Sequence, residues 1–486
     1  MEITRTEEIK MILEKGAKSA MTLPEIIREE VDEFVKSPQY AEMVAADDYY
    51  SNRSAVQEKT NEFKNRSNTK IEHPYLKRFV EQKANYLLAK PFSVSSENAQ
   101  YSAALEEMFD NTFRQKIKRF AKSSVKSGIA WLAPYFDIKD GKSVLKWQLL
   151  PSKEVKPLWE DYEHEKISGY IRFYPQVVYE GKNKKVIEKF EFWSANGVEK
   201  YVAPHIGGVL KPDCDPETGL YQYSHVEING KAFNWEKIPI VWLKYTDEEL
   251  PLLHFLRELI DDINWQTSVT ADVLRDVAKF IFVLRNYGGA NLEEFVRDLR
   301  KSLAIKVDAD GAVDKLEPTL NIDAVMQFLD KNRRDLFDFA NAVDTKDPEL
   351  GNASGLAINF RYMDLDNDCA ALGANLQSAF ERMKLFIDVA LKTAGKGDFS
   401  NDTFEVVFNT DLPVNETEII NNIRNSEGII SKRTQRVNHP YVVDVEEEEK
   451  QIKKEQEEAR AEFGEGLFND VFNSSNPDGL NNGGEE

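Results

Sequence analysis

The chain has 486 residues, 41% of them hydrophobic and 11% aromatic, which is enough apolar material for packed cores and excludes a wholly disordered protein. Its 63 basic and 84 acidic residues give a formal charge of −21, which argues against a free-standing DNA binder because such proteins need a basic excess. No run approaches the roughly 18 apolar residues that a membrane-spanning helix needs. We therefore expect no membrane partner.

The first residues, MEITRTEEIKMILEKG, lack the apolar segment of a secretory signal. Two cysteines, Cys214 and Cys369, are too few for a disulfide framework or a thiolate metal cluster. Both observations indicate folding in a reducing cytoplasm. The charge is uneven, because residues 444–486 hold fourteen acidic and four basic side chains. An acidic surface near DNA reduces sticking, so the charge remains compatible with a conduit through which DNA slides.

Along the chain, the hydrophobic pattern predicts an α+β protein with several regions. The first 60 residues and the stretch 73–125 have a helical period. From Ile129 the pattern changes to short runs such as IAWLAPYFD and VIEKFEFWS. These runs are rich in aromatic and β-branched residues, which favours a mainly antiparallel sheet.

Two long helices are predicted next, at 252–276 and from Ile322 to Val343. A small αβ insertion separates them. The segment DTKDPELGNASGLA follows the second helix and predicts a loop, because it contains Asp-Pro and two glycines. A further helix is predicted from about Ile358 to Lys392, then a helix pair and a polar tail.

Four passages of the chain are distinctive. They are IEHPYLKRFVEQKANYLLAKPFSV at 71–94, LLPSKEVKPLW at 149–159, WEKIPIVWLKYTDEELPLLHFLRELIDDINWQTS at 235–268 and DPELGNASGLAINFRYMDLDNDCAALGANLQSAFERM at 347–383. In this order, they resemble the portal protein family of tailed phages that infect Gram-positive bacteria. In the last passage, Gly351-Asn352, Ser354-Gly355 and Ala357 match the family's loop-to-helix junction.

This resemblance implies a non-enzymatic subunit of a twelve-fold ring at one capsid vertex, without a cofactor. The ring would pass double-stranded DNA during packaging and ejection. Its implied partners are terminase, a head–tail adaptor, and the major capsid and scaffold proteins, and its place is the virion after assembly in the host cytoplasm. The implied regions are an N-terminal helical arm (1–60), a wing (61–251), stem helix 1 (252–276), a clip (277–321), stem helix 2 (322–344), a tunnel loop (345–358), a long wing helix with a return strand (359–414), crown helices (415–462) and a disordered acidic tail (463–486).

Basic residues on the second long helix are candidates for contact with DNA in such a channel. Lys331 and Arg334 belong to a polar stripe whose members recur every three or four residues. A ring of them would contact phosphates without reading sequence. The alternative is that Lys331, Arg333 and Arg334 pair with nearby acids, within or between subunits. The stripe comprises Gln327, Lys331, Arg334, Asp338 and Asn341.

The tunnel loop supplies the other candidate DNA-facing residues. They are Lys346, Asn352, Ser354 and Gly355. Glycine and asparagine permit backbone angles that suit a mobile loop. The alternative is an ordinary surface connector.

Motifs for catalysis are weak. Residues 394–397, AGKG, lack the upstream glycine and the hydroxyl of a nucleotide-binding loop, which argues against an ATPase motor. Asp364, Asp366 and Asp368 have the first spacings of a calcium loop but fall in a predicted helix. The histidines show no metal-binding pairing. A magnesium-dependent phage DNA-processing enzyme, supported only by these acids and by Asp308 and Asp310, and a non-channel capsid or scaffold protein remain as alternatives.

Overall fold

The computed structural model divides the chain into two compact units. The first unit consists of Met1–Thr345 and Tyr362–Asp411, and the second of Lys346–Arg361 and Leu412–Glu486. The residues that the structure describes are 21–60, 66–139, 142–276, 281–285, 291, 293, 312–316, 321–346, 355–409, 416–442, 445 and 448–458.

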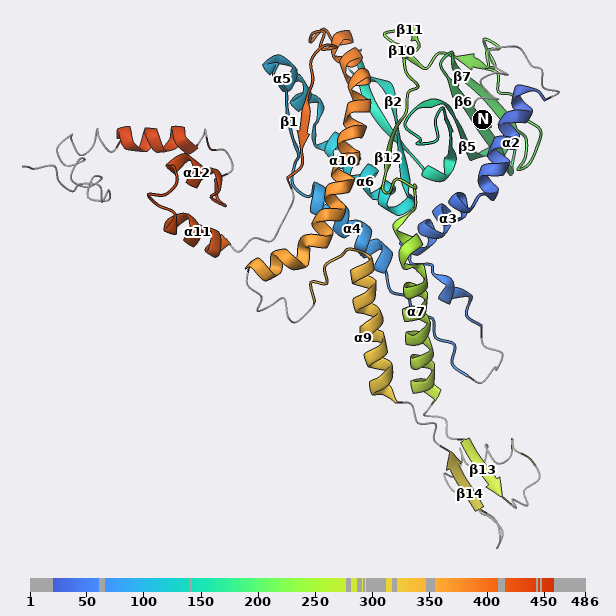
Figure 1. The fold of residues 1–486 in the computed structure, drawn as a ribbon. Coiled ribbons are helices and arrows are strands. Elements are labelled where there is room, and N and C mark those ends of the chain that lie inside the picture. Colours follow the sequence, from blue (N-terminus) through green and yellow to red (C-terminus); the bar gives the residue numbers. More distant parts are fainter. Residues whose placement is uncertain are drawn as a thin grey trace, which may run out of the picture. The chain divides into compact units, whose positions relative to one another are not determined.

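Helices predominate in the described N-terminal part of the first unit (Figure 1). The first of them begins after Thr22, whose backbone N–H and hydroxyl both donate to the carboxylate of Glu25, at 2.7 and 2.8 Å. The last ends at Gly128, where a Cβ atom would lie 1.9 Å from the carbonyl oxygen of Glu249. Only glycine fits there. These helices are α2 (Leu23–Lys36), α3 (Pro38–Tyr50), η1 (Ala55–Glu58), α4 (Tyr75–Leu88), α5 (Ala99–Met108) and α6 (Asn111–Ser127).

The continuous helical stretch predicted at 73–125 is wrong between α4 and α5. A short strand, β1 (Ser93–Ser95), lies there and pairs antiparallel with β15 (Glu405–Val407). Pro91 cannot donate a backbone hydrogen bond to a continuing helix, and Val94 is buried against residues far along the chain.

The predicted β-rich region is present as two antiparallel sheets. A three-stranded sheet has the order β12-β2-β3, and α6 packs against it. A larger sheet has the order β4-β5-β6-β7-β8, with β9 paired to β7. The strands are β2 (Ile129–Lys139), β3 (Lys142–Leu150), β4 (Val155–Trp159), β5 (Ile167–Glu180), β6 (Asn183–Ser194), β7 (Gly197–Ala203), β8 (Lys211–Pro212), β9 (Gln222–Tyr223) and β12 (Val241–Lys244), with η2 (Ser152–Glu154) before β4 and a hairpin of β10 (Val226–Ile228) and β11 (Lys231–Phe233).

Two long helices lie side by side in the first unit, α7 (Leu252–Asp276) and α9 (Ile322–Phe339) (Figure 1). α7 has the predicted bounds. α9 ends at Phe339, before the predicted end, because the chain turns at Asn341, which has a positive φ of 46°. Within the insertion, β13 (Ile281–Arg285) pairs antiparallel with β14 (Ala312–Leu316), and most of the predicted insertion lies outside the described residues.

The main core of the first unit forms around α10 (Gly355–Thr393), a helix of 39 residues. From Leu372 onward most of its apolar side chains are buried in a core shared with α4, α6 and the three-stranded sheet. These include Leu376, Phe380, Met383 and Ile387. The unit is thus a mixed helix-and-sheet body, as predicted.

The second unit contains α11 (Glu416–Asn425), α12 (Lys432–Val437) and helical residues at 448–458. Among the described residues of the whole chain, no helix is both long enough and apolar enough to cross a membrane.

Candidate functional site

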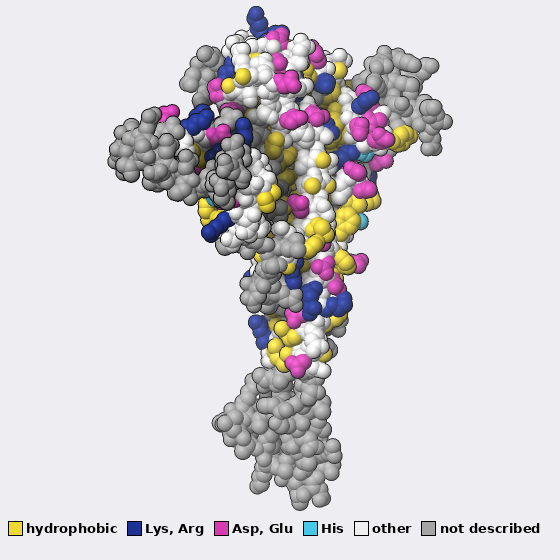
Figure 2. All heavy atoms as spheres, turned by 60° about the vertical axis from the view of Figure 1, so that its left-hand side comes forward, with side chains coloured by type: hydrophobic (Ala, Val, Ile, Leu, Met, Phe, Trp, Pro, Cys, Tyr) yellow, Lys and Arg dark blue, Asp and Glu magenta, His cyan; other side chains and the backbone are white. Residues whose placement is uncertain are grey.

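The side chains of α9 divide into four sectors around the helix axis, because an α-helix turns by about 100° per residue. One sector faces α7 and is buried or half-buried, with Leu329, Asn332 and Leu336. The opposite sector carries the predicted polar stripe, in which Lys331 and Arg334 are exposed. Figure 2 shows Lys/Arg, Asp/Glu and apolar side chains interspersed on the visible face of this helix pair.

Exposed apolar side chains lie in both flanking sectors. Ile322 and Met326 lie on one flank, and Phe328 and Phe339 on the other. Phe339 is 62% exposed and Met326 is 51% exposed. Apolar surface on both sides of one helix is typical of a helix that contacts neighbours through two different faces.

The basic residues of α9 have different surroundings. Lys331 pairs with Asp335 one turn away, but its side chain is 68% exposed. Arg333 turns toward the body of the unit and donates to Asp344 at 2.6 Å. Arg334 is exposed and has no ion pair with the residues that the structure describes. Pairing within the subunit therefore accounts for Lys331 and Arg333, and Arg334 remains available to an outside anion.

An extended strap, residues 66–74, lies along the far end of α7. Every second backbone N–H of the strap donates to a polar side chain on every fourth residue of the helix. Two extended residues span about 6.7 Å and four helical residues about 6 Å, so the two periods nearly match. The bonds run from Ser67 to Asp276 (3.1 Å), from Thr69 to Asp272 (2.6 Å), from Ile71 to Ser268 (2.9 Å) and from His73 to Asn264 (3.0 Å).

Further contacts fix the strap in this register. Asn264 is fully buried and also donates to the hydroxyl of Ser54 at 3.1 Å. Asp272 pairs with Lys59, which is 9% exposed. Burial raises the pKa of Asp272, but hydrogen bonds from Lys59 and Thr69 outweigh it and hold that pKa below its ordinary value. The strap thereby joins α7 to the N-terminal helices.

A second polar junction joins α4 to α10. Lys83 is fully buried, and its ammonium lies 2.7 Å from the carboxylate of Asp368 and 3.3 Å from the carbonyl oxygen of Asn341, just after α9. Tyr245 donates to Asp368 at 3.1 Å. Lys83 therefore connects three elements that are distant in sequence.

In the acidic run at 364–368, Asp366 and Asp368 bond to side chains of a neighbouring helix. It lies inside α10, as predicted, and Asp366 accepts a hydrogen bond of 2.7 Å from Tyr86 while Asp368 holds Lys83. Among the described residues, no three His, Cys, Asp or Glu side chains are grouped so that they could hold a metal ion. Asp308 and Asp310 lie outside the described residues.

The predicted loop residues are only partly described. Lys346 is exposed and belongs to the second unit, whereas Asn352 and Ser354 lie outside the described residues. The predicted loop of 345–358 is too long, because α10 already begins at Gly355. Glycine is tolerated at the start of a helix, so its presence does not exclude the first turn.

Sequence reasoning missed both polar junctions. The available signals were the polar residues spaced by three or four along the otherwise apolar face of α7, and a lysine within the run FVEQKANYLL. Lys83, Asn264 and Ser268 lie in passages that carry the family resemblance. The first and third of those passages meet at the strap, and the first and fourth meet at Lys83.

Comparison with known proteins agrees with the resemblance. Residues 36–462 match the family described as phage portal protein, SPP1 Gp6-like. The portal protein of Bacillus phage SPP1 is 27% identical over 473 residues, covering 93% of this chain and 90% of that protein. The portal protein of Clostridium phage phiCD119 is 24% identical over 430 residues, covering 84% of this chain and 91% of that protein. The predicted family is confirmed.

Proposed function

The chain belongs to the SPP1 Gp6-like family of phage portal proteins, and from that membership we propose that twelve copies form a ring around a DNA channel at one capsid vertex. DNA enters the capsid through this channel during packaging and leaves through it during ejection. The ring docks terminase and a head–tail adaptor on one side and contacts the major capsid and scaffold proteins.

The four sectors of α9 are the observation that carries this proposal. A ring requires two different, complementary faces on each subunit, because a head-to-tail contact must repeat around the axis. The apolar flanks of α9, with Met326 on one and Phe339 on the other, supply such faces. The polar stripe between them then faces the channel, where Arg334 and Lys331 meet phosphates.

The same proposal assigns segments of the chain to the regions of a portal subunit. α7 and α9 are the stem helices, the insertion at 277–321 is the clip, residues 345–354 form the tunnel loop, and the helices from 416 form the crown. In the stem, the strap fixes the position of α7 along its own axis relative to the N-terminal helices.

The ring is tested by negative-stain electron microscopy of the purified protein together with its mass by light scattering. We expect rings with a central hole and a mass near twelve times 55.8 kDa. Because a subunit can require scaffold protein for assembly, the same measurement is made on protein co-expressed with the phage's scaffold. Small closed oligomers under both conditions would contradict the proposal.

A double substitution, Lys331→Ala with Arg334→Ala, tests the polar stripe. We expect intact rings and a several-fold lower yield of packaged DNA, because two rings of positive charge are removed from the channel wall. The matched control is Lys182→Ala with Lys184→Ala on the exposed hairpin between β5 and β6. Wild-type packaging by the stripe variant would mean that these side chains do not act on DNA in the channel.

A further inference from the structure

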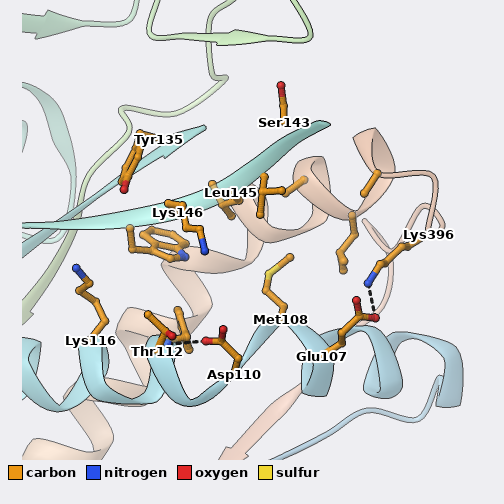
Figure 3. Close-up of a pocket in the computed structure, with 16 residues that line it drawn as sticks. Glu107, Met108, Asp110, Thr112, Lys116, Tyr135, Ser143, Leu145, Lys146 and Lys396 are labelled. Carbon is orange, nitrogen blue, oxygen red and sulfur yellow. Dashed lines mark hydrogen bonds and ion pairs between the residues drawn. The ribbon is translucent and has the colours of Figure 1, made fainter. Parts of the chain in front are cut away.

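A cavity of about 630 Å³ opens in the first unit between the end of α5, the start of α6, strand β3 and the end of α10 (Figure 3). Its floor is apolar. Phe113, Leu145, Trp147 and Leu391 are buried there, and Met108 lies beside them. These side chains belong to the folded core or adjoin it, so the cavity is held open by elements that are fixed in place.

The acidic groups of this cavity are already engaged by the protein. Glu107 pairs with Lys396 at 2.5 Å. Asp110 caps α6 by accepting the backbone N–H of Phe113 at 2.7 Å. Neither carboxylate forms an ion pair with Lys116 or Lys146.

Two lysines of the same cavity have no partner among the residues that the structure describes. Lys116 comes from α6 and Lys146 from β3, and both are half-buried. Neither forms an ion pair or hydrogen bond with any residue that the structure describes. In Figure 3 their amino groups lie in the space between the helix and the strand, near the apolar floor. Two unpaired cations beside an apolar surface are unusual in a chain with a charge of −21.

We propose that this cavity binds an acidic peptide segment of a partner protein. A large apolar side chain of the peptide, such as phenylalanine, occupies the floor between Phe113 and Trp147, and neighbouring carboxylates pair with Lys116 and Lys146. Charge-assisted hydrogen bonds and aromatic contacts together give such a site its affinity. The binding site is independent of the channel.

The chemistry of the cavity favours an acidic peptide over nucleic acid. A phosphate backbone carries no apolar group, so it would pair with Lys116 and Lys146 but leave the apolar floor unfilled. A peptide fits both features because one side chain enters the cavity and its neighbours remain at the rim.

The experiment uses the full chain and a fluorescein-labelled pentapeptide, EEFDE, with fluorescence anisotropy as the readout. Peptides QQFNQ and EEADE separate the contribution of the charges from that of the ring. The charge variant is Lys116→Glu with Lys146→Glu, and its matched control is Lys182→Glu with Lys184→Glu on the exposed β5–β6 hairpin. A second variant, Ala394→Trp, fills the cavity without changing charge. Circular dichroism verifies that each variant is folded.

We expect EEFDE to bind the charge variant and the filled variant at least tenfold more weakly than it binds the wild-type chain. Its affinity for the control variant is expected to equal that for the wild-type chain. QQFNQ and EEADE are each expected to bind more weakly than EEFDE to the wild-type chain. Absence of binding, or binding that survives both cavity variants, would overturn the proposal. Displacement of the peptide by a short DNA duplex would assign the site to nucleic acid instead.

Discussion

Replacing Lys83 by methionine is expected to lower the free energy of unfolding of the subunit by about 3–5 kcal/mol. The substitution keeps the volume of the side chain but removes the ammonium that faces Asp368 at 2.7 Å. Asp368 then keeps a largely buried charge without its cation, and the carbonyl oxygen of Asn341 loses a donor. Denaturant unfolding followed by circular dichroism at a fixed protein concentration measures the loss.

Two further variants make this prediction specific. Lys77→Met, on the exposed side of the same helix, is expected to change the free energy of unfolding by less than about 0.5 kcal/mol. Adding Asp368→Asn to Lys83→Met removes the unpaired charge, so we expect it to recover part of the loss. Unfolding of Lys83→Met at the wild-type denaturant concentration would show that the buried pair contributes nothing to stability.

Replacing Asn264 by leucine is expected to lower the free energy of unfolding by about 2–4 kcal/mol, because it leaves polar groups without a buried partner at about 1–3 kcal/mol for a group left unsatisfied. These groups are the backbone N–H and the ring Nδ1 of His73, and the hydroxyl of Ser54. The substitution also releases the last bond of the strap. We therefore expect faster amide hydrogen exchange at residues 67–73, measured by mass spectrometry, together with the lower stability.

The control for the strap is Thr267→Val on the same helix. The Thr267 hydroxyl donates only to the carbonyl oxygen of Ile263 within α7, at 2.7 Å, so its loss leaves the strap intact. Equal exchange rates in Asn264→Leu and in the wild-type chain would mean that the strap is held by its other contacts.

The local sequence pattern was sufficient to predict the main helices and strands and the protein family. The apolar period over 252–276 predicted α7 to the residue, since no glycine or proline interrupts it. The runs IAWLAPYFD and VIEKFEFWS, rich in aromatic and β-branched residues, predicted β2 and β6, because such side chains pack well on the surface of a sheet. The four passages predicted the portal family, which the comparison confirms.

Tertiary structure decided where the polar groups find partners. Lys83 and Asp368 are 285 residues apart, and His73 and Asn264 are 191 apart. One sequence contains no information on such pairs, because burial and pairing depend on which elements meet. The same reason explains two of the incorrect boundaries: β1 forms because β15 reaches it, and α9 ends early where the chain turns and Lys83 meets the carbonyl oxygen of Asn341. The sequence thus determined the elements and the family, while only the packed structure determined the polar junctions and the cavity.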